Sequence, residues 1–167
     1  MPLIEHLNKR QPKSAWMALM KSHPEFFEEV LNLALSDRYP EGWRAAWWVY
    51  SCMHRNDQRV QPLISKIIES LGNKKSGHQR ELLKILSKMN LDEEHEGALF
   101  DVCLTLWEDL SKQSSVRITA FRELVRIAWN HPELKSELKH FTGEIYSATL
   151  SPGIKISLDR LVLKAGI

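Results

Sequence analysis

The sequence has little cysteine, glycine or proline, and it contains no long apolar run. Its two cysteines, Cys52 and Cys103, lie far apart without C-x-x-C spacing, which argues against a disulfide framework or a redox motif. Seven glycines and seven prolines are too few for a low-complexity chain of 167 residues. No stretch reaches the roughly eighteen apolar residues of a membrane span. The first thirteen residues include Glu5, Lys9 and Arg10 instead of an apolar signal segment, so we expect a cytoplasmic protein.

Sequence signatures of catalysis are also absent. The chain contains no G-x-G-x-x-G, G-x-x-x-x-G-K-[ST], H-E-x-x-H, G-x-S-x-G or EF-hand pattern. The seven histidines are scattered singly, and His23 and His131 precede prolines, which favours structural or solvated roles. Adjacent acids such as Glu28 and Glu29 do not face each other on a helix. We therefore expect a protein that is not an enzyme and uses no metal and no cofactor.

Apolar residues recur at intervals of three and four along most of the chain, as in Val60, Ile64, Ile67 and Leu71. This period predicts amphipathic helices, whereas the period of two that strands require is not sustained. Proline and glycine separate the helices from one another. The predicted helices span residues 14–21, 24–36, 41–55, 57–71, 78–89, 92–111, 115–130, 132–148 and 152–165.

The spacing of turn residues indicates an internal repeat. Gly42, Gly77, Ser115 and Gly153 follow one another at 35, 38 and 38 positions, which is the length of one helix pair. A second register agrees, because the tripeptide His-Pro-Glu at 23–25 recurs at 131–133, an offset of 108 or about three repeats. One helix pair cannot bury its apolar face alone, so neighbouring pairs are expected to stack.

The segment Ser-Val-Arg-Ile-Thr-Ala-Phe-Arg-Glu-Leu, residues 115–124, resembles the second helix of a HEAT repeat. Gly42 and Gly153 begin looser copies, while the copy near Gln79 and Arg80 departs from the pattern. The resemblance covers most of residues 24–165. It implies an all-α, right-handed superhelix or solenoid of about four HEAT-like, armadillo-like helix pairs in a single domain, with the first helix as an N-terminal cap. The implied pairs are 24–55, 57–89, 92–130 and 132–165.

Charge is distributed unevenly between the two helices of each expected pair. The second, or B, helices carry eleven basic residues against four acids, and the first, or A, helices carry sixteen acids against four bases. HEAT-type stacks line their concave surface with B helices, so the resemblance implies a basic groove able to attract an acidic peptide or a phosphate backbone. The predicted partner-binding residues are Trp48, Arg80, Lys84, Arg122, Arg126 and Lys155.

Two arginines are expected to be structural instead. In HEAT repeats the arginine near the start of a B helix typically braces neighbouring repeats through a loop aspartate. Arg44 with Asp37, and Arg117 with Asp109, are predicted to form such braces.

The six tryptophans raise the question of aromatic stacking on a ligand. Trp43 and Trp47 share the apolar stripe of their helix and are predicted to be core residues. Trp48 lies on the other side of that helix beside the basic residues, so it is the first stacking candidate, and Trp129 is a second.

These features support an interaction scaffold that binds a protein or acidic peptide. The alternative is nucleic-acid binding, related to the HEAT-like alkylpurine DNA glycosylases, whose concave surface combines basic and aromatic residues with a carboxylate. No matching catalytic set can be placed here, since Trp107-Glu108-Asp109 falls on an A helix. A third possibility is a homo-oligomer or complex subunit that uses the apolar C-terminal end, including Leu161, Leu163 and Ile167. The sequence does not fix the oligomeric state.

Overall fold

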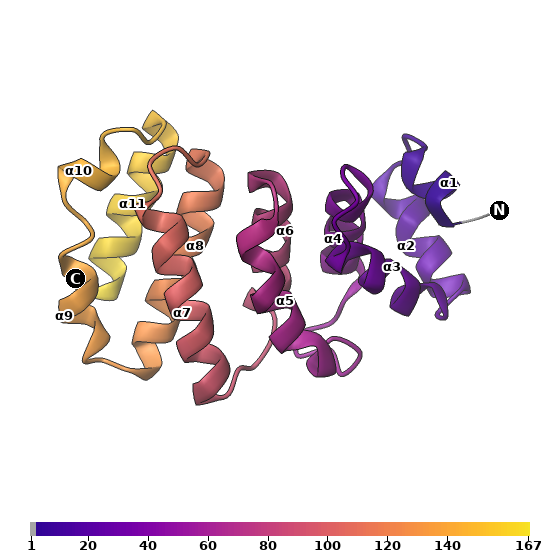
Figure 1. The fold of residues 1–167 in the computed structure, drawn as a ribbon, viewed down its shortest axis with the longest axis horizontal. Coiled ribbons are helices and arrows are strands. Elements are labelled where there is room, and N and C mark those ends of the chain that lie inside the picture. The colour runs from indigo at the N-terminus through magenta and orange to yellow at the C-terminus, as the bar shows by residue number, and fades with distance from the viewer. Residues whose placement is uncertain (1–2) are drawn as a thin grey trace. The chain divides into compact units, whose positions relative to one another are not determined.

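The computed structural model describes residues 3–167, and every regular element in them is a helix (Figure 1). The chain divides into two compact units, residues 1–90 (unit 1) and 91–167 (unit 2). Unit 1 contains α1 (Leu3–Asn8), α2 (Lys13–Ser22), α3 (Phe26–Leu35), α4 (Glu41–Cys52), the 3₁₀ turn η1 (Gln61–Leu63), α5 (Ile64–Ser70), the 3₁₀ turn η2 (Leu71–Asn73) and α6 (Ser76–Ser87). Unit 2 contains α7 (Glu93–Glu108), α8 (Ser114–Asn130), α9 (Leu134–Lys139), α10 (Glu144–Ser147) and α11 (Pro152–Ala165).

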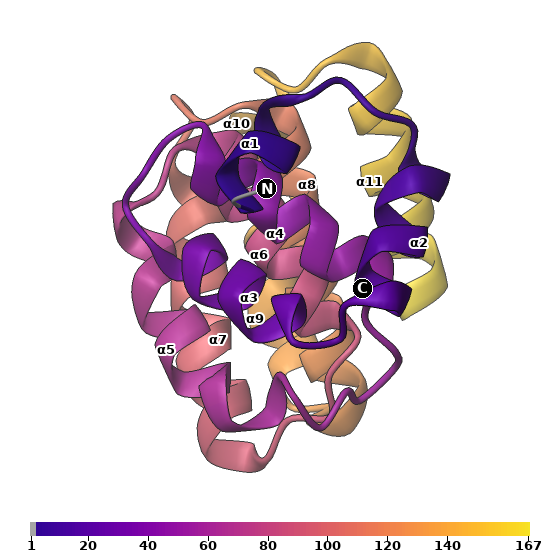
Figure 2. The same cartoon turned by 90° about the vertical axis from the view of Figure 1, so that its right-hand side faces the viewer.

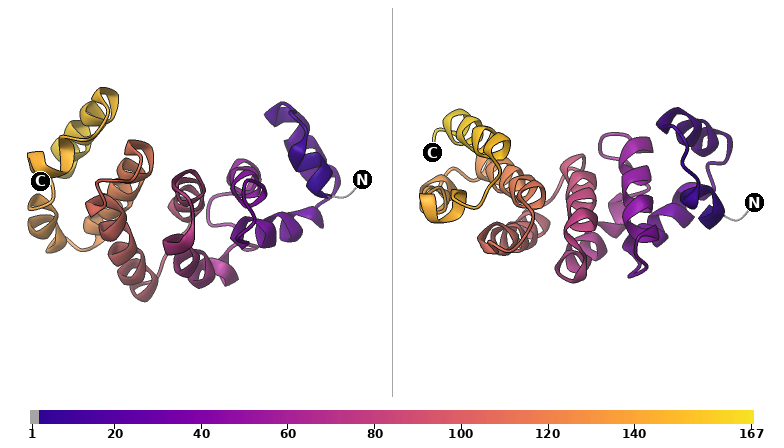
Figure 3. Two further views of the ribbon diagram at one scale, coloured as in Figure 1. Left: turned by 45° about the horizontal axis from the view of Figure 1, so that its top comes forward. Right: turned by 90° about the horizontal axis from the view of Figure 1, so that it is seen from above.

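Unit 1 has two layers of helices (Figure 3). The A helices α3 and α5 form one layer, and the B helices α4 and α6 form the other. Ala45 and Ala46 on α4 are fully buried, and their small side chains allow α3 and α6 to approach closely. Helices α1 and α2 both pack on α4, so it is contacted from several sides, as its largely apolar sequence predicts (Figure 2).

Unit 2 repeats this arrangement, with α7 and α9 in one layer and α8 and α11 in the other (Figure 3). In its core, the buried Trp107 of α7 packs against the buried Phe121 of α8 with ring centroids 4.7 Å apart. Helix α11 lies against α8, and its buried residues are Leu158 and Ala165.

Two predicted helices are interrupted in the structure. The segment predicted as a helix at 57–71 begins with a 3₁₀ turn at Pro62, and α5 proper starts only at Ile64. The segment 132–148 forms two short helices, α9 and α10, because Gly143 adopts an extended conformation and starts a new helix. Helix α1 was not predicted at all, since six residues are too few to show a helical period.

The His-Pro-Glu tripeptide forms the same turn in both units. His23 and His131 each end a helix with φ −130°, and their N–H groups donate to the carbonyls of Leu19 and Ile127 at 2.9 and 3.2 Å. The carbonyl of each histidine then accepts from the residue three positions on, at 3.0 Å in unit 1 and 2.9 Å in unit 2. The sequence repeat is therefore also a repeat of backbone structure.

Hydrogen bonds that involve side chains confirm the length of the repeat. Within each unit, most of the bonds that join distant segments connect residues 34 to 39 positions apart. Lys88 Nζ, for example, donates to the carbonyl of Tyr50 at 2.7 Å, and Trp107 Nε1 donates to the carbonyl of Phe141 at 2.8 Å. Each such bond joins a helix pair to the next, as expected of a stacked repeat. The handedness of the superhelix, the number of pairs and the single-domain organisation stay predictions.

Candidate partner-binding surfaces

In unit 1, the basic residues predicted on α6 surround a buried carboxylate. Glu81 is 2% exposed, and it accepts hydrogen bonds from Arg80 Nε at 3.3 Å and from Lys84 Nζ at 2.9 Å. Both basic side chains remain about one-third exposed. Their positive charge therefore reaches the surface, but the buried Glu81 carboxylate partly neutralises it.

The same arrangement recurs on α8 of unit 2. Glu123 is 3% exposed and accepts from Arg126 Nε at 2.9 Å, one helical turn away. Burial raises the pKa of Glu123, although Arg126 opposes the shift. Arg122 on the outer side of α8 is exposed and has no carboxylate partner within residues 3–167. Lys155 is exposed near the start of α11, the helix packed beside α8.

The structure differs from the predicted placement of the tryptophans on α4. Trp48, predicted as a surface stacking residue, is 2% exposed and packs against Trp16 of α2. Trp43 and Trp47, predicted as core residues, are half-buried. The prediction for Trp48 is wrong because α2 covers that side of α4. Its indole is therefore not available to a ligand in this structure.

Trp129 at the end of α8 is the exposed tryptophan of unit 2, with 54% of its surface accessible. Lys135 places its Nζ 4.4 Å from the centroid of the Trp129 ring. Arg122, Arg126 and Trp129 are separated by four and three positions and so share one face of the helix. We call these three residues with Lys135 the α8 stripe.

The predicted arginine braces exist in altered form. Arg44 donates to the side chain of Asn8 at 2.7 Å instead of to Asp37. Arg117 is 1% exposed and donates to the carbonyls of Trp107 at 2.9 Å and Tyr146 at 2.7 Å, and to the hydroxyl of Thr149 at 3.1 Å. Arg117 is structural, as predicted, but its hydrogen-bond partners are backbone carbonyls and a hydroxyl instead of Asp109.

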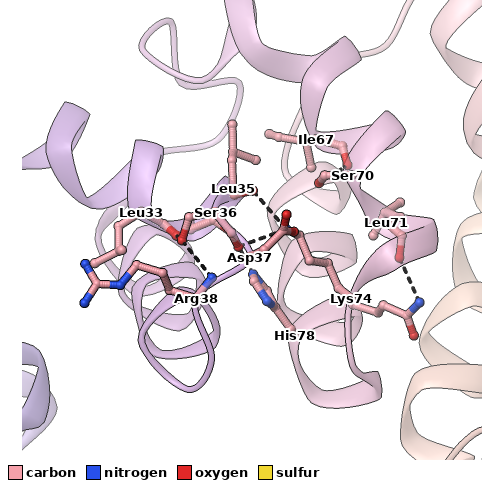
Figure 4. Close-up of polar contacts among 12 residues, drawn as sticks. Leu33, Leu35, Ser36, Asp37, Arg38, Ile67, Ser70, Leu71, Lys74 and His78 are labelled. Atoms are coloured by element: carbon pink, nitrogen blue, oxygen red, sulfur yellow. Dashed lines mark hydrogen bonds and ion pairs between the residues drawn. The ribbon is translucent and has the colours of Figure 1, made fainter.

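Asp37 pairs with Lys74, at the end of α3 (Figure 4). Lys74 Nζ also donates to the carbonyls of Leu35 at 3.0 Å and Ser36 at 2.8 Å, and the buried His78 bonds the carbonyl of Ala34 at 2.6 Å. These bonds satisfy the carbonyls that a helix end leaves unpaired. The pocket beside them includes Asp37 and Lys74, whose charges neutralise each other.

The predicted site left out two residues that the structure brings together. Lys88, directly after α6, follows Arg80 and Lys84 at the same four-residue spacing, a signal that the helical period could have revealed. Tyr50 on α4 joins this group only through tertiary packing.

Metal centres and membrane spans are two further classes of site. Within residues 3–167, no group of three or more histidine, cysteine, aspartate or glutamate side chains is arranged to hold a metal ion. No helix in that range combines the length and apolar character that crossing a membrane requires.

Stacked helix pairs, joined by hydrogen bonds one repeat apart, define a helical repeat protein. A family model described as the HEAT repeat domain matches residues 3–165, and the chain belongs to this family. Comparison with curated proteins and with solved structures gives no match. HEAT repeat domains generally serve as scaffolds for protein interactions, and the family is typically non-catalytic.

Proposed function

We propose that this protein is a non-catalytic scaffold that binds an acidic segment of a partner protein on the basic faces of its B helices. The α8 stripe carries the proposal. It combines an exposed tryptophan with arginines, two of the three residue types enriched where binding energy concentrates in protein interfaces. Arg122 has no acid to neutralise it within residues 3–167, so a carboxylate of the partner can pair with it.

The buried glutamates favour a protein partner over a nucleic acid. Glu81 and Glu123 lie directly beneath the basic residues of α6 and α8, which lowers the positive potential of both surfaces. A binder committed to a phosphate backbone gains affinity from uncompensated positive charge. A protein segment with a few acids and apolar side chains also uses the exposed indole of Trp129.

Nucleic-acid binding is the second candidate, and one observation favours it. Trp43, Trp47 and Tyr50, all half-buried, follow one side of α4 beside the basic residues of α6. Single-stranded nucleic acids are often bound where aromatic and basic residues alternate in this way. The stacking face of Tyr50 is, however, occupied by Lys84 and Lys88.

The test is binding of a fluorescent acidic peptide, measured by anisotropy across a salt series, with duplex and single-stranded DNA as comparisons. We expect the peptide to bind and R122E with W129A to weaken binding at least about tenfold. K66E is the matched control, because Lys66 is an exposed lysine on the A helix α5. If DNA alone binds, with a steep loss of affinity at higher salt, nucleic-acid binding replaces the scaffold proposal.

A further inference from the structure

The outward face of α11 carries two exposed apolar side chains. Leu163 is 84% exposed, the highest fraction among the large hydrophobic side chains within residues 3–167, and Ile156 is exposed as well. They are seven positions apart, which is close to two helical turns, so they share one face of the helix. The buried Leu158 and Ala165 each follow one of them by two positions and therefore lie on the opposite face. The apolar pair thus points away from the core of unit 2.

Two opposite charges lie between these apolar residues. Asp159 and Arg160 come three and four positions after Ile156, so they flank the line from Ile156 to Leu163 on opposite sides. Both side chains are exposed, and neither has a hydrogen-bond or ion-pair partner within residues 3–167. We call these four residues the α11 face. It is apolar along its centre, with negative charge on one flank and positive charge on the other.

A second copy of the same helix complements this face when the two helices run parallel. A twofold axis along parallel helices brings each flank of one helix against the opposite flank of the other. Asp159 of each copy then lies beside Arg160 of the other, while Ile156 and Leu163 meet their own counterparts at the centre. Antiparallel helices would instead bring Asp159 against Asp159 and Arg160 against Arg160. Flanking charges of this kind set the orientation of paired helices.

We infer that the α11 face is a homodimer interface, on which a second copy of this chain packs its own α11 in parallel. The interface is isologous, because each copy contributes the same residues. Removal of Ile156 and Leu163 of both copies from water drives the association. One pair of helices of 14 residues each is a small interface, so we expect a reversible dimer with a Kd of about 1–100 µM.

This inference goes beyond the proposed function and does not depend on it. The α8 stripe lies on α8 and α9, whereas the α11 face lies on another helix of unit 2. Self-association can be measured without any partner segment. Its failure would therefore leave the scaffold proposal untouched, and the failure of peptide binding would leave the dimer untouched.

The first experiment is sedimentation velocity at protein concentrations from about 1 to 200 µM, a range that brackets the expected Kd. We expect the average mass of the wild-type protein to rise with concentration from that of one chain towards twice that value. L163E should weaken the dimer at least about tenfold, because it places two carboxylates at the centre of the interface. M17E is the matched control, since Met17 is an exposed apolar residue on α2, and it should dimerise like the wild type.

Charge reversal tests the parallel pairing. D159R and R160D each bring like charges together on both flanks, so each should weaken the dimer at least about tenfold. Combining D159R with R160D in one chain restores an opposite-charge pair on each flank. This double variant should therefore regain the affinity of the wild-type protein.

Disulfide trapping gives a second measure of orientation. In the parallel dimer Leu163 faces its own counterpart, so L163C should form a cross-linked dimer under mild oxidation. The background is C52S, because Cys52 is only half-buried, whereas the remaining cysteine, Cys103, is buried. M17C in the same background should stay uncrosslinked.

Each contrary result overturns a stated part of the inference. A strict monomer at the highest concentration removes the homodimer and leaves the α11 face to a different partner. A dimer that persists in L163E uses another surface. A dimer that is lost in L163E but tolerates both single charge reversals, without an L163C cross-link, excludes the parallel pairing. Circular dichroism checks that each variant folds.

Discussion

At the scale of single residues, Gly42 is the most tightly enclosed glycine of the chain. A Cβ atom at this position would lie 2.8 Å from Cε1 of His78, 3.1 Å from the carbonyl oxygen of Ser36 and 3.2 Å from that of Leu33. His78 cannot move away freely, because its ring is buried and bonded to Ala34. The close packing of α3, α4 and α6 at this point requires a residue without a side chain.

We predict that G42A lowers the free energy of unfolding by about 1–2 kcal/mol, since overpacking outweighs the better helix propensity of alanine. Gly97 is the matched control, because it lies within α7 and a Cβ added there would have no neighbouring atom within 4 Å. G97A should raise stability by about 0.5–1 kcal/mol. Urea unfolding measures both, and equal effects of the two substitutions would contradict this explanation.

Arg117 supports a second prediction at this scale. Its guanidinium bonds the three acceptors through three separate nitrogen atoms, Nε, Nη1 and Nη2, and the one nitrogen of lysine cannot occupy all three positions. R117K should therefore cost about 2–3 kcal/mol of stability, because buried carbonyls lose charged hydrogen bonds. The same substitution at the exposed Arg122 should cost almost nothing. A comparable loss at both sites, measured by thermal or urea unfolding, would show that the three bonds contribute little.

The burial of single residues could be predicted only in part from the sequence. Positions 43, 47 and 48 all fit an apolar helix, and the sequence did not show which side of that helix α2 covers. Arg117 was recognised as structural from its place in the motif, but its carbonyl partners depend on backbone positions that no motif contains. Trp129, by contrast, was predicted as a stacking candidate, and its side chain is exposed as that role requires.

At the scale of elements, Glu96 of α7 fixes the turn between α8 and α9. It accepts from Asn130 Nδ2 at 2.7 Å and contacts Nε2 of His131 at 2.6 Å. The hydrogen bond to Glu96 raises the pKa of His131, and the charges of Glu96, Glu133 and Glu93 add to the shift. The charged form of His131 thus strengthens the contact between the turn and α7.

We predict that E96Q moves the pKa of His131 back towards its ordinary value, as followed by an NMR titration of the imidazole ring. E133Q is the comparison, because the Glu133 carboxylate lies 3.8 Å from His131 Nδ1, which is too far for a hydrogen bond. E133Q should change the pKa of His131 much less than E96Q does. If the pKa of His131 changed more in E133Q than in E96Q, Glu133 and not Glu96 would be the carboxylate that holds this turn.

Elements were predicted well where helices are long and regularly periodic. Helix α11 begins and ends at the predicted residues, and α8 differs by one residue at its start. Predictions failed where a local break competes with the period, as at Pro62 and Gly143. Apolar spacing continues across both breaks, so the period alone could not reveal them.

At the scale of the whole molecule, the two units contain histidines that respond to pH in opposite directions. Burial lowers the pKa of His78 in unit 1, where the carbonyl of Ala34 and the charges of Lys74 and Asp37 act as lesser influences. The unfolded chain therefore binds more protons than the folded one just below the ordinary histidine pKa, and unit 1 loses stability as the pH falls below it. His131 in unit 2 has a raised pKa, so its contribution is complete below the ordinary value and is lost as the pH rises through the raised one.

Hydrogen exchange followed by mass spectrometry tests this difference. On acidification from slightly alkaline to mildly acidic pH, protection of α3–α6 should fall, while that of α7–α9 should hold or rise, after correction for intrinsic exchange rates. H131Q should remove the response of unit 2 and leave that of unit 1. A parallel change of both units in the wild-type protein would be the contrary outcome.

The fold class and the repeat length could be predicted for the molecule as a whole, because both depend on periods within the sequence. The side-chain arrangement of the candidate partner-binding surfaces could be predicted only in part. Arg80, Lys84 and Arg126 were identified from charge, but the glutamates beneath them and the tyrosine that holds two lysines are consequences of packing.

The position of Arg117 along the chain also matters while the protein is being synthesised. Its partners Tyr146 and Thr149 follow it by 29 and 32 residues. At about 5–20 residues per second, a ribosome needs about two to six seconds to supply them. During that interval α8 can pair with α7, but the Arg117 guanidinium stays hydrated because two of its acceptors have not been synthesised. The last helix pair is therefore needed to complete the one before it, and a nascent chain stalled in this interval would expose α8 to chaperones.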